Sequence, residues 1–237
     1  MIAIILAAGV GRRLRPLTNI IPKSLIKIGK KEILAYQIDY LKEYNVDNFV
    51  IATGLFHQKV EQFIRNNYPD INVLFVYNPI YKKTNYIYTL WLTKDYVNDD
   101  IVLLHGDLIF DKKIVKKLVD AKRSVVVVSK ESETNEKDFK ALVVNNRVIK
   151  IDVNIYGKNV FSCMPMYKLK KDDIKLWFME IKKFIKREKV NCYAEEALNN
   201  ITSKIRLYPL YFKNELCMEI DTMEDIKIAK NYLCKNE

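Results

Sequence analysis

A cluster of glycine and basic residues follows the first apolar segment of the chain. Residues 2–8, IAIILAA, end in small side chains, and the residues that could contact a ligand here are Leu6, Ala7, Ala8, Gly9, Gly11, Arg12, Arg13 and Lys23. Small residues let a ligand approach backbone N–H groups closely, and guanidinium and ammonium groups attract an anion. The spacing predicts a cradle for the phosphate groups of a nucleoside triphosphate.

Arg13 and Lys23 are the residues that we expect to act in catalysis. Attack at the α-phosphorus of a nucleoside triphosphate requires negative charge to be balanced on that phosphate and on the departing pyrophosphate. A guanidinium and an ammonium group can supply this balance. The alternative is a basic surface loop ahead of a helix, but no helical pattern follows the glycines directly.

Two aspartates follow predicted strands and could bind a divalent cation. Asp107 ends the run DIVLLHGD, next to Gly106, which we expect in the nucleotide site, and Asp221 lies in CMEIDTMED. Ligands of α/β sheets bind beyond the carboxyl ends of strands. Mg²⁺ takes one or two carboxylates together with phosphate oxygens. We therefore predict that both aspartates hold Mg²⁺, although either alone could be a helix N-cap.

Apolar, β-rich segments alternate with amphipathic ones in the first half of the chain. The expected strands are 2–8, 48–54, 71–78, 100–107 and 124–130, and the expected helices are 32–44, 57–67, 84–97 and 112–121. Short, continuous apolar runs are typical of strands buried on both faces of a parallel sheet. The alternation indicates βαβ units, so the predicted fold is α/β, Rossmann-like and doubly wound, with a mostly parallel sheet.

The pattern changes after residue 130. We expect a hairpin over 139–152 that turns at Asn145-Asn146, because asparagine tolerates positive φ in tight turns. The other expected elements are strands near 160–167, 206–213 and 217–220 and helices over 172–189, 192–203 and 222–234. Thr222 and Asp225 resemble an N-cap. We predict one domain, 1–237, with a nucleotide-binding part over about 1–130 and a small β-rich acceptor lobe over about 131–237.

Basic residues outnumber acidic ones, 40 to 29, and give a net charge of +11. This balance favours phosphorylated ligands, although much of the charge falls on predicted helix faces that solvent can reach. No helix-turn-helix, zinc-finger or RNP pattern supports a nucleic acid partner. We expect free thiols, a cytoplasmic location and no membrane association, because the cysteines lack metal-ligand spacing and no apolar run is long enough for a signal peptide or a span. The sequence leaves the oligomeric state open, a homodimer included.

The opening motif resembles that of a known enzyme family. LAAGVGRRLRPLTNIIPKSL closely follows the pattern L-A-A-G-x-G-[TS]-R-[LM]-x-P-x-T-x-x-x-P-K of the nucleotidyltransferases that join a nucleoside triphosphate to a phosphorylated sugar or head group. Arg12 departs from this pattern, because the family usually has a small hydroxyl residue there. The resemblance implies the family's fold through most of the chain. It also implies that Asp107 and Asp221, which match the family's two aspartate contexts, hold the metal.

Residues 77–92 resemble one subgroup of this family in particular. YNPIYKKTNYIYTLWL is similar to the pattern N-x-x-Y-x-x-x-N-x-x-Y-[ST]-L of cytidylyltransferases that act on phosphocholine and related head groups. Sugar-1-phosphate enzymes usually carry glycine-rich sequence here, whereas residues 77–92 contain no glycine. An amide both donates and accepts hydrogen bonds, which suits a pyrimidine edge, so Asn78, Thr84 and Asn85 are expected near the base and ribose. The alternative, an amphipathic helix with aromatic core residues, fits Ile87, Leu90 and Trp91.

Aromatic and acidic residues are the candidates for an acceptor pocket, because they suit a quaternary ammonium group. We select Tyr88, Tyr193, Glu195 and Glu219. Choline-type relatives often have an aromatic residue in a Thr-Asn-Glu-Trp-Phe context, whereas 134–140 reads TNEKDFK. Because of this difference, other zwitterionic acceptors, such as 2-aminoethylphosphonate or an amino acid phosphoamide, are candidates in addition to phosphocholine. A solvated loop is the alternative interpretation of 134–140.

Together these features predict a Mg²⁺-dependent cytidylyltransferase. A phosphoryl or phosphonate oxygen of a small acceptor attacks the α-phosphorus of CTP, and pyrophosphate leaves. Such an acceptor is already ionised and needs no general base, so we expect His105 to be a packed strand-end residue and His57 a surface residue. Two alternatives stay open: a sugar-1-phosphate or inositol-1-phosphate nucleotidyltransferase, and a non-catalytic nucleotide-binding subunit.

Overall fold

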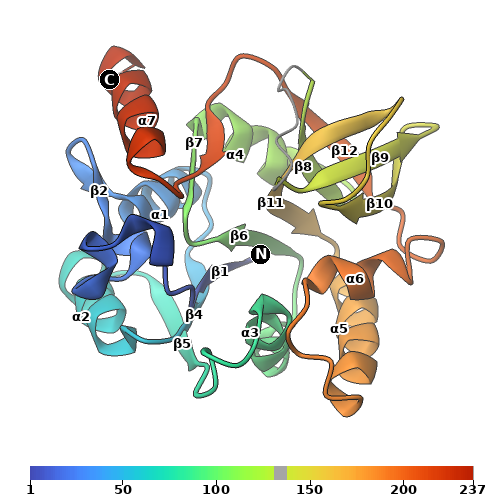
Figure 1. Cartoon of the computed structure of the whole chain (residues 1–237), viewed down its shortest axis with the longest axis horizontal. Coiled ribbons are helices and arrows are strands. Elements are labelled where there is room, and N and C mark those ends of the chain that lie inside the picture. The colour runs from blue at the N-terminus through green and yellow to red at the C-terminus, as the bar shows by residue number, and fades with distance from the viewer. Residues whose placement is uncertain (131–137, 237) are drawn as a thin grey trace.

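A computed structural model describes residues 1–130 and 138–236, and one large sheet runs through this part of the chain (Figure 1). Its nine strands are β1 (Ile2–Ala7), β4 (Asn48–Thr53), β5 (Asn72–Tyr77), β6 (Ile101–His105), β8 (Val125–Ser129), β9 (Lys140–Val144), β10 (Arg147–Asp152), β11 (Val160–Leu169) and β12 (Tyr208–Phe212). β1 lies between β4 and β6 and parallel to both, and β5 continues the parallel part beyond β4. The predicted α/β, Rossmann-like fold is confirmed.

Strand β11 joins the two parts of the chain. It runs antiparallel to β6 and β8 along its second half and antiparallel to β9 along Val160–Ser162. β12 adds to β8 in parallel. The hairpin of β9 and β10 turns at Asn145 and Asn146, whose φ values of 49° and 58° confirm the predicted tight turn. The sheet therefore passes without a break from the parallel first part into the predicted β-rich lobe.

The helices follow the predicted order: the helix over 57–67 has the predicted bounds, the last helix runs on to Asn236, and the other five are shorter than predicted. They are α1 (Ile33–Glu43), α2 (His57–Asn67), α3 (Tyr86–Leu92), α4 (Lys112–Asp120), α5 (Lys171–Lys186), α6 (Ala194–Asn199) and α7 (Met223–Asn236). The helix expected over 84–97 ends early, because the Thr93 hydroxyl donates to the Leu90 carbonyl and a 3₁₀ turn follows. None of the described helices is both long and apolar enough to cross a bilayer.

Four short strands add two small antiparallel sheets. β2 (Lys27–Ile28) pairs with β3 (Lys31–Glu32), and β7 (Leu108–Phe110) pairs with β13 (Cys217–Glu219). The strand expected over 100–107 therefore ends at His105, and Asp107 lies in the turn between β6 and β7. Because β13 lies beside β7, the turn that carries Asp107 comes close to the segment that leads into α7.

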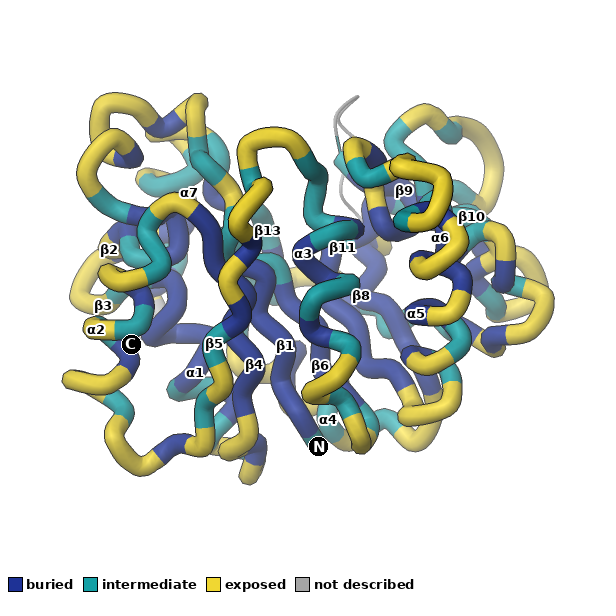
Figure 2. The backbone as a smooth tube through the Cα atoms, turned by 90° about the horizontal axis from the view of Figure 1, so that it is seen from below, coloured by how far each residue is buried: buried dark blue, intermediate teal, exposed yellow. Residues whose placement is uncertain are grey.

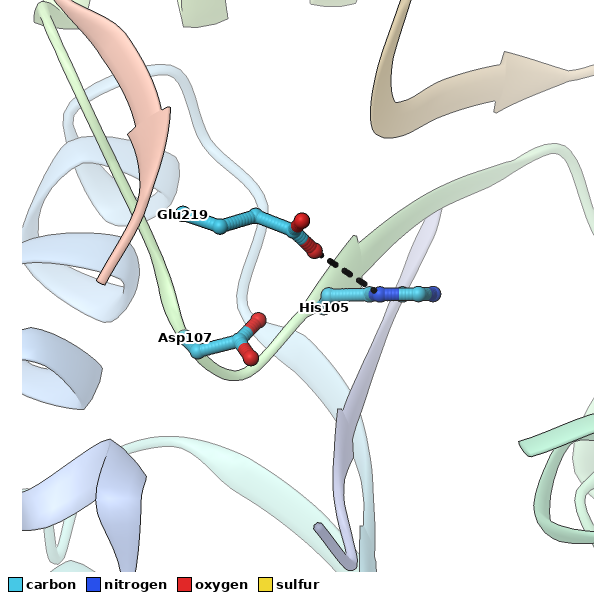
Figure 3. A group of neighbouring side chains, drawn as sticks. All are labelled: His105, Asp107 and Glu219. Atoms are coloured by element: carbon cyan, nitrogen blue, oxygen red, sulfur yellow. Dashed lines mark ion pairs between the residues drawn. The ribbon is translucent and has the colours of Figure 1, made fainter. Parts of the chain in front are cut away.

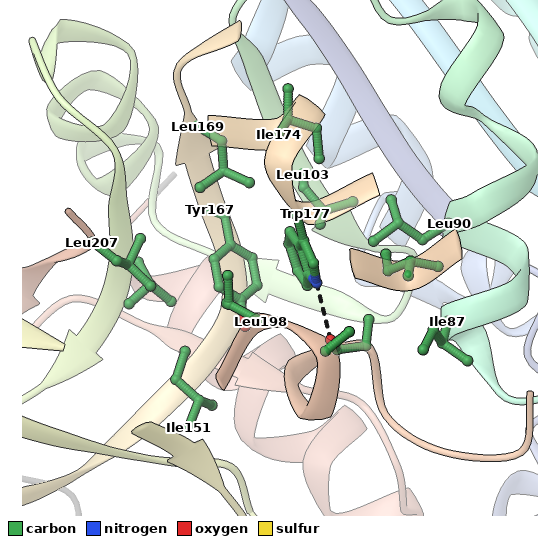
Figure 4. Close-up of a cluster of buried hydrophobic side chains, with 14 of the residues drawn as sticks. Ile87, Leu90, Leu103, Ile151, Tyr167, Leu169, Ile174, Trp177, Leu198 and Leu207 are labelled. Atoms are coloured by element: carbon green, nitrogen blue, oxygen red, sulfur yellow. Dashed lines mark hydrogen bonds between the residues drawn. The ribbon is translucent and has the colours of Figure 1, made fainter. Parts of the chain in front are cut away.

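Two apolar layers enclose the sheet. Successive residues of β1 alternate between them: Ile4 packs in the layer that holds α3, α5 and α6, and Ile5 packs in the layer that holds α1, α2 and α4. Figure 2 shows the central strands in the buried colour. Trp177 of α5 lies in the first layer, fully buried, and its indole N–H donates to the Ala194 carbonyl at 3.0 Å (Figure 4). A core on both faces holds the strand ends rigidly in place.

Candidate active site

A cavity of about 360 Å³ lies at the carboxyl ends of β1 and β6. Ten residues selected from the sequence line it: Leu6, Ala7, Ala8, Gly9, Arg12, Lys23, Thr84, Asn85, Gly106 and Asp107. The remaining lining residues are Val10, Ser24, Tyr81, Lys82, Tyr86, Thr89, His105 and Asn191. Crevices at the carboxyl ends of strands are the usual ligand sites of open α/β sheets. The glycine loop, the 81–89 region and the β6 end thus meet around one space.

Glycine is required at two places beside this cavity. Gly11 has φ +63°, and a Cβ there would lie 2.9 Å from the Thr18 side chain. Thr18 donates a hydrogen bond to the Gly11 carbonyl at 2.7 Å, which fixes the turn. A Cβ on Gly106 would lie 3.0 Å from Cβ of Ala7. Small residues therefore let β1 and the β6 end approach each other closely and leave room for a ligand above them.

Lys23 links the two predicted metal-binding aspartates. Its ammonium nitrogen lies 2.5 Å from Asp107 Oδ2 and 2.7 Å from Asp221 Oδ1. Arg13 pairs with the other oxygen of Asp221 at 2.6 Å. Burial acts to lower the pKa of Lys23, but the two carboxylates outweigh burial and raise it. The structure thus brings all four residues together, with Lys23 charged and 8% exposed.

Glu219 and His105 extend this charged group. Nδ1 of His105 lies 3.5 Å from Glu219 Oε1, and ligand atoms of His105, Asp107 and Glu219 lie within 4.8 Å of one another (Figure 3). Burial raises the pKa of Glu219. Burial also acts to raise the pKa of Asp107, but Lys23 and His105 outweigh it and lower that pKa.

The donor set fits a divalent cation. Asp107 Oδ1 is buried and has no hydrogen-bond partner among the described residues. Mg²⁺ prefers carboxylate oxygens and keeps positions for phosphate oxygens and water. Asp107, with Asp221 and Glu219 beside it, offers such oxygens. These residues could therefore hold Mg²⁺ next to a bound triphosphate.

One of the two histidines lies as predicted, and the other does not. His105 is packed at a strand end, with its ring 4.5 Å from that of Tyr86, as the sequence suggested. His57 is not a simple surface residue: its Nδ1 lies 2.7 Å from the Thr53 hydroxyl, and its ring lies 5.3 Å from that of Tyr77. It starts α2 beside the end of β4, so it packs where strand and helix meet.

Asn78 lies beneath the cavity rather than in it. The residue is 1% exposed, and its amide nitrogen donates to the hydroxyls of Thr84 and Thr89 at 3.1 and 3.0 Å. Its carbonyl oxygen accepts from the Ile80 amide. Contact between Asn78 and a base was expected, but these bonds occupy the amide. Its position instead fixes the 79–85 loop, which presents Thr84 and Asn85 to the cavity.

The acceptor candidates lie apart from the cavity lining. Tyr193 packs on Tyr86 and Phe139, with ring centroids 6.0 and 4.9 Å away. Glu195 is 1% exposed, accepts a hydrogen bond from the Tyr167 hydroxyl at 2.6 Å, and has its pKa raised by burial to about 8. Tyr88 of α3 is half-buried.

The contacts of Glu195 make it a core group rather than a surface contact for an acceptor. The 134–137 stretch, with Lys137, lies outside the described residues. Asp138 is described, and its carbonyl accepts from the Lys140 ammonium.

Sequence reasoning missed Tyr86 and Ser24. Both line the cavity, and each has a buried hydroxyl without a hydrogen-bond partner among the described residues. Ser24 follows Lys23 directly, and Tyr86 follows Asn85, so adjacency to selected residues was the available signal. Asn191, from the segment before α6, carried no local signal, since only the tertiary fold brings it to the cavity.

Comparison with known proteins agrees with the geometry. The family profile described as "Nucleotidyl transferase" matches residues 2–146, more than half of the chain. The chain belongs to this family. The predicted family is therefore confirmed, and the matched region holds the glycine loop, the 81–89 region and Asp107.

Individual relatives are similar over different lengths. A choline-phosphate cytidylyltransferase of Haemophilus influenzae is 27% identical over 95% of this chain and 94% of its own. A CTP:phosphoglutamine cytidylyltransferase of Campylobacter jejuni is 33% identical over 56% of this chain and 53% of its own. The solved structure of an inositol-1-phosphate CTP transferase from T. maritima has a TM-score of 0.81 at 24% identity, and the match covers 97% of this chain and 93% of the other. At that identity, the last similarity concerns the fold alone.

Proposed function

We propose that this nucleotidyltransferase moves a cytidylyl group from CTP to a small phosphorylated or phosphonate head group and releases pyrophosphate. The observation that carries the proposal is the convergence of Arg13, Lys23, Asp107 and Asp221 at the rim of the cavity. A site that only binds a nucleotide has no need of paired carboxylates beside the phosphate cradle. Relatives named as cytidylyltransferases support CTP as the donor.

The chain's own residues have distinct tasks in this reaction. Backbone N–H groups of the Gly9–Gly11 loop and the Arg12 side chain receive the phosphates, while Arg13 and Lys23 balance charge as the bond to pyrophosphate breaks. Asp107 and Asp221, with Glu219 nearby, would hold Mg²⁺, which when bound lowers the charge on the phosphate oxygens. The acceptor oxygen is already ionised, so an in-line attack on the α-phosphorus needs no base from the protein.

The base and ribose belong at the Thr84 and Asn85 side of the cavity. Asn85 caps α3 through its side-chain oxygen, which accepts from the Tyr86 amide at 2.7 Å, so its amide nitrogen stays available as a donor. A hydrogen-bond donor suits the carbonyl oxygen of a cytosine ring. Thr84 is held by Asn78, which limits the positions that its hydroxyl can take.

For the acceptor we propose a zwitterionic head group of the phosphocholine, 2-aminoethylphosphonate or amino acid phosphoamide type. Tyr86 and Tyr193 form an aromatic wall, and the half-buried Glu219 lies beside His105 at the β6 end, where the His105 ring contacts Tyr86. Aromatic faces and acids together stabilise a cationic group. An inositol-1-phosphate acceptor is the second candidate, because the inositol-1-phosphate CTP transferase from T. maritima has the same fold.

Pyrophosphate release, measured for each common nucleoside triphosphate against each acceptor, tests the proposal. The acceptors are phosphocholine, 2-aminoethylphosphonate, phosphoglutamine, inositol 1-phosphate and glucose 1-phosphate, with Mg²⁺ present throughout. We expect turnover with CTP and one of the first three. Turnover with a sugar phosphate and UTP would replace the proposed substrates, and no turnover with any pair would favour a binding subunit.

A further inference from the structure

The ammonium group of Lys23 lies between two carboxylates that the proposed function assigns to a metal ion. Its nitrogen is 2.5 Å from Asp107 and 2.7 Å from Asp221, and its side chain is 9% exposed. Arg13 reaches Asp221 from the solvent side, with a side chain that is 59% exposed. Lys23, and not Arg13, therefore lies between the two carboxylates.

The formal charges of Lys23, Arg13, Asp107 and Asp221 already balance one another. The carboxylates of Asp107 and Asp221 face the Lys23 ammonium and the Arg13 guanidinium, while Glu219 beside them pairs with His105. A divalent cation that entered alone would bring two uncompensated charges into a half-buried site next to an ammonium group. Repulsion between like charges at such short distances is strong where solvent screens poorly.

A nucleoside triphosphate changes this balance. Its phosphates carry several negative charges, and Lys23 lines the cavity in which we place them. A lysine side chain is a flexible stem that can carry its charge from the carboxylates to phosphate oxygens. The carboxylate oxygens released in this way are ligands that Mg²⁺ prefers.

From this geometry we infer that Lys23 is a resident counter-ion of the metal site, so that a divalent cation binds only together with the nucleoside triphosphate. This inference rests on the proposed function, since it takes Asp107 and Asp221 as the metal ligands. It gives Lys23 two successive roles: it neutralises the carboxylates in the free protein and the phosphates in the complex. Metal and nucleotide then enter as one complex rather than one after the other.

Mn²⁺ binding in the absence of nucleotide, followed by electron paramagnetic resonance, tests this inference, because Mn²⁺ accepts the same oxygen ligands. The proteins are wild type, Lys23→Gln and the control Arg13→Gln. Each variant removes one positive charge, but only Lys23→Gln opens the space between the carboxylates. We expect Lys23→Gln to bind Mn²⁺ about tenfold or more tightly than wild type, and Arg13→Gln to stay within about threefold. Equal affinities of wild type and Lys23→Gln, or equal gains in both variants, would overturn the inference.

A second arm uses only the wild-type protein, so it does not depend on the folding of a variant. Thermal unfolding is measured with Mn²⁺ alone, with CTP and chelator, and with Mn²⁺ and CTP together. We expect Mn²⁺ alone to leave the midpoint unchanged and the pair to raise it more than CTP does, since ligands that bind only the folded state stabilise it. A rise with Mn²⁺ alone that matches the pair contradicts the counter-ion role. If neither CTP nor the pair raises the midpoint, the proposed function itself fails.

Discussion

The glycine-loop side of the cavity and the Tyr193 side balance their charged groups in different ways. On the first side Lys23 and Arg13 neutralise Asp107 and Asp221 through direct ion pairs. On the second side burial raises the pKa of Glu195, which accepts a hydrogen bond from the Tyr167 hydroxyl, and Tyr193 packs on Phe139. The first side thus holds its charges in ion pairs for which an anion can compete, whereas the second keeps Glu195 protonated and uncharged in the core.

Asp107→Asn, on the glycine-loop side, should have the largest effect of the substitutions considered for the two sides. Loss of this carboxylate removes the metal ligand that we propose and a partner of Lys23. We expect kcat to fall about a hundred- to a thousandfold, as for the loss of other groups that balance transition-state charge. Steady-state kinetics with CTP and the active acceptor measure the effect. Asp95→Asn, at an exposed position, is the control. A fall of less than tenfold in a folded Asp107→Asn protein would remove Asp107 from the catalytic group.

Glu195→Gln should change stability on the acceptor side instead. The folded-state pKa of Glu195 is about 8, above its ordinary value of 4.5, so the folded protein holds a proton that the unfolded chain releases. Stability from this group is complete below about pH 4.5 and is lost as the pH rises through 8, by on the order of a few kcal/mol. Glutamine keeps an oxygen for Tyr167 but cannot ionise.

Urea unfolding at pH 5, 7 and 9 measures this effect as the difference between wild type and Glu195→Gln. The variant should be the more stable protein at pH 9, and the difference should shrink toward pH 5. A difference that does not vary with pH would mean that Glu195 is ionised in the folded protein, and the contrast between the two sides would then be lost.

Asn78→Ala should have a smaller effect, confined to the nucleotide side. The substitution leaves the Thr84 and Thr89 hydroxyls and the Ile80 amide without their partner, which costs about 1–3 kcal/mol of stability. KM for CTP should rise because the 79–85 loop loses its anchor, while KM for the acceptor stays the same. Asn67→Ala, which removes one exposed hydrogen bond, is the matched control. A change in KM for the acceptor alone would contradict the positioning role.

The smallest expected effect is that of Tyr193→Ala. The residue is 38% exposed, and its ring packs on Tyr86 and Phe139. Aromatic pairs contribute about 0.5–1.5 kcal/mol beyond the area they bury. We expect KM for the acceptor to rise about three- to tenfold with KM for CTP unchanged. Tyr96→Ala, at an exposed site in the 3₁₀ turn after α3, is the control. An unchanged KM for the acceptor would place its head group elsewhere.

The two sides also differ in how many of their site residues could be predicted from the sequence. The glycine loop and Asp107 could be predicted because each belongs to a short segment at a strand end, where residue type and local backbone decide the geometry. Glu195 was selected for its charge alone, but the packing of α5, α6 and β11 decides that it is buried against Tyr167. Asn78 was selected for its amide, and two threonines that follow it in the chain use that amide first. Competition among polar groups depends on tertiary distances that a linear pattern does not contain.

The most direct test of cytidylyl transfer at this cavity is ³¹P NMR of a mixture of the protein, CTP, Mg²⁺ and the acceptor that releases most pyrophosphate. The proposed reaction predicts that the triphosphate signals give way to free pyrophosphate and to the coupled pair of signals of a new anhydride between CMP and the acceptor, in equal amounts. Formation of CDP or orthophosphate from CTP, or a triphosphate that stays intact with every acceptor, would contradict it.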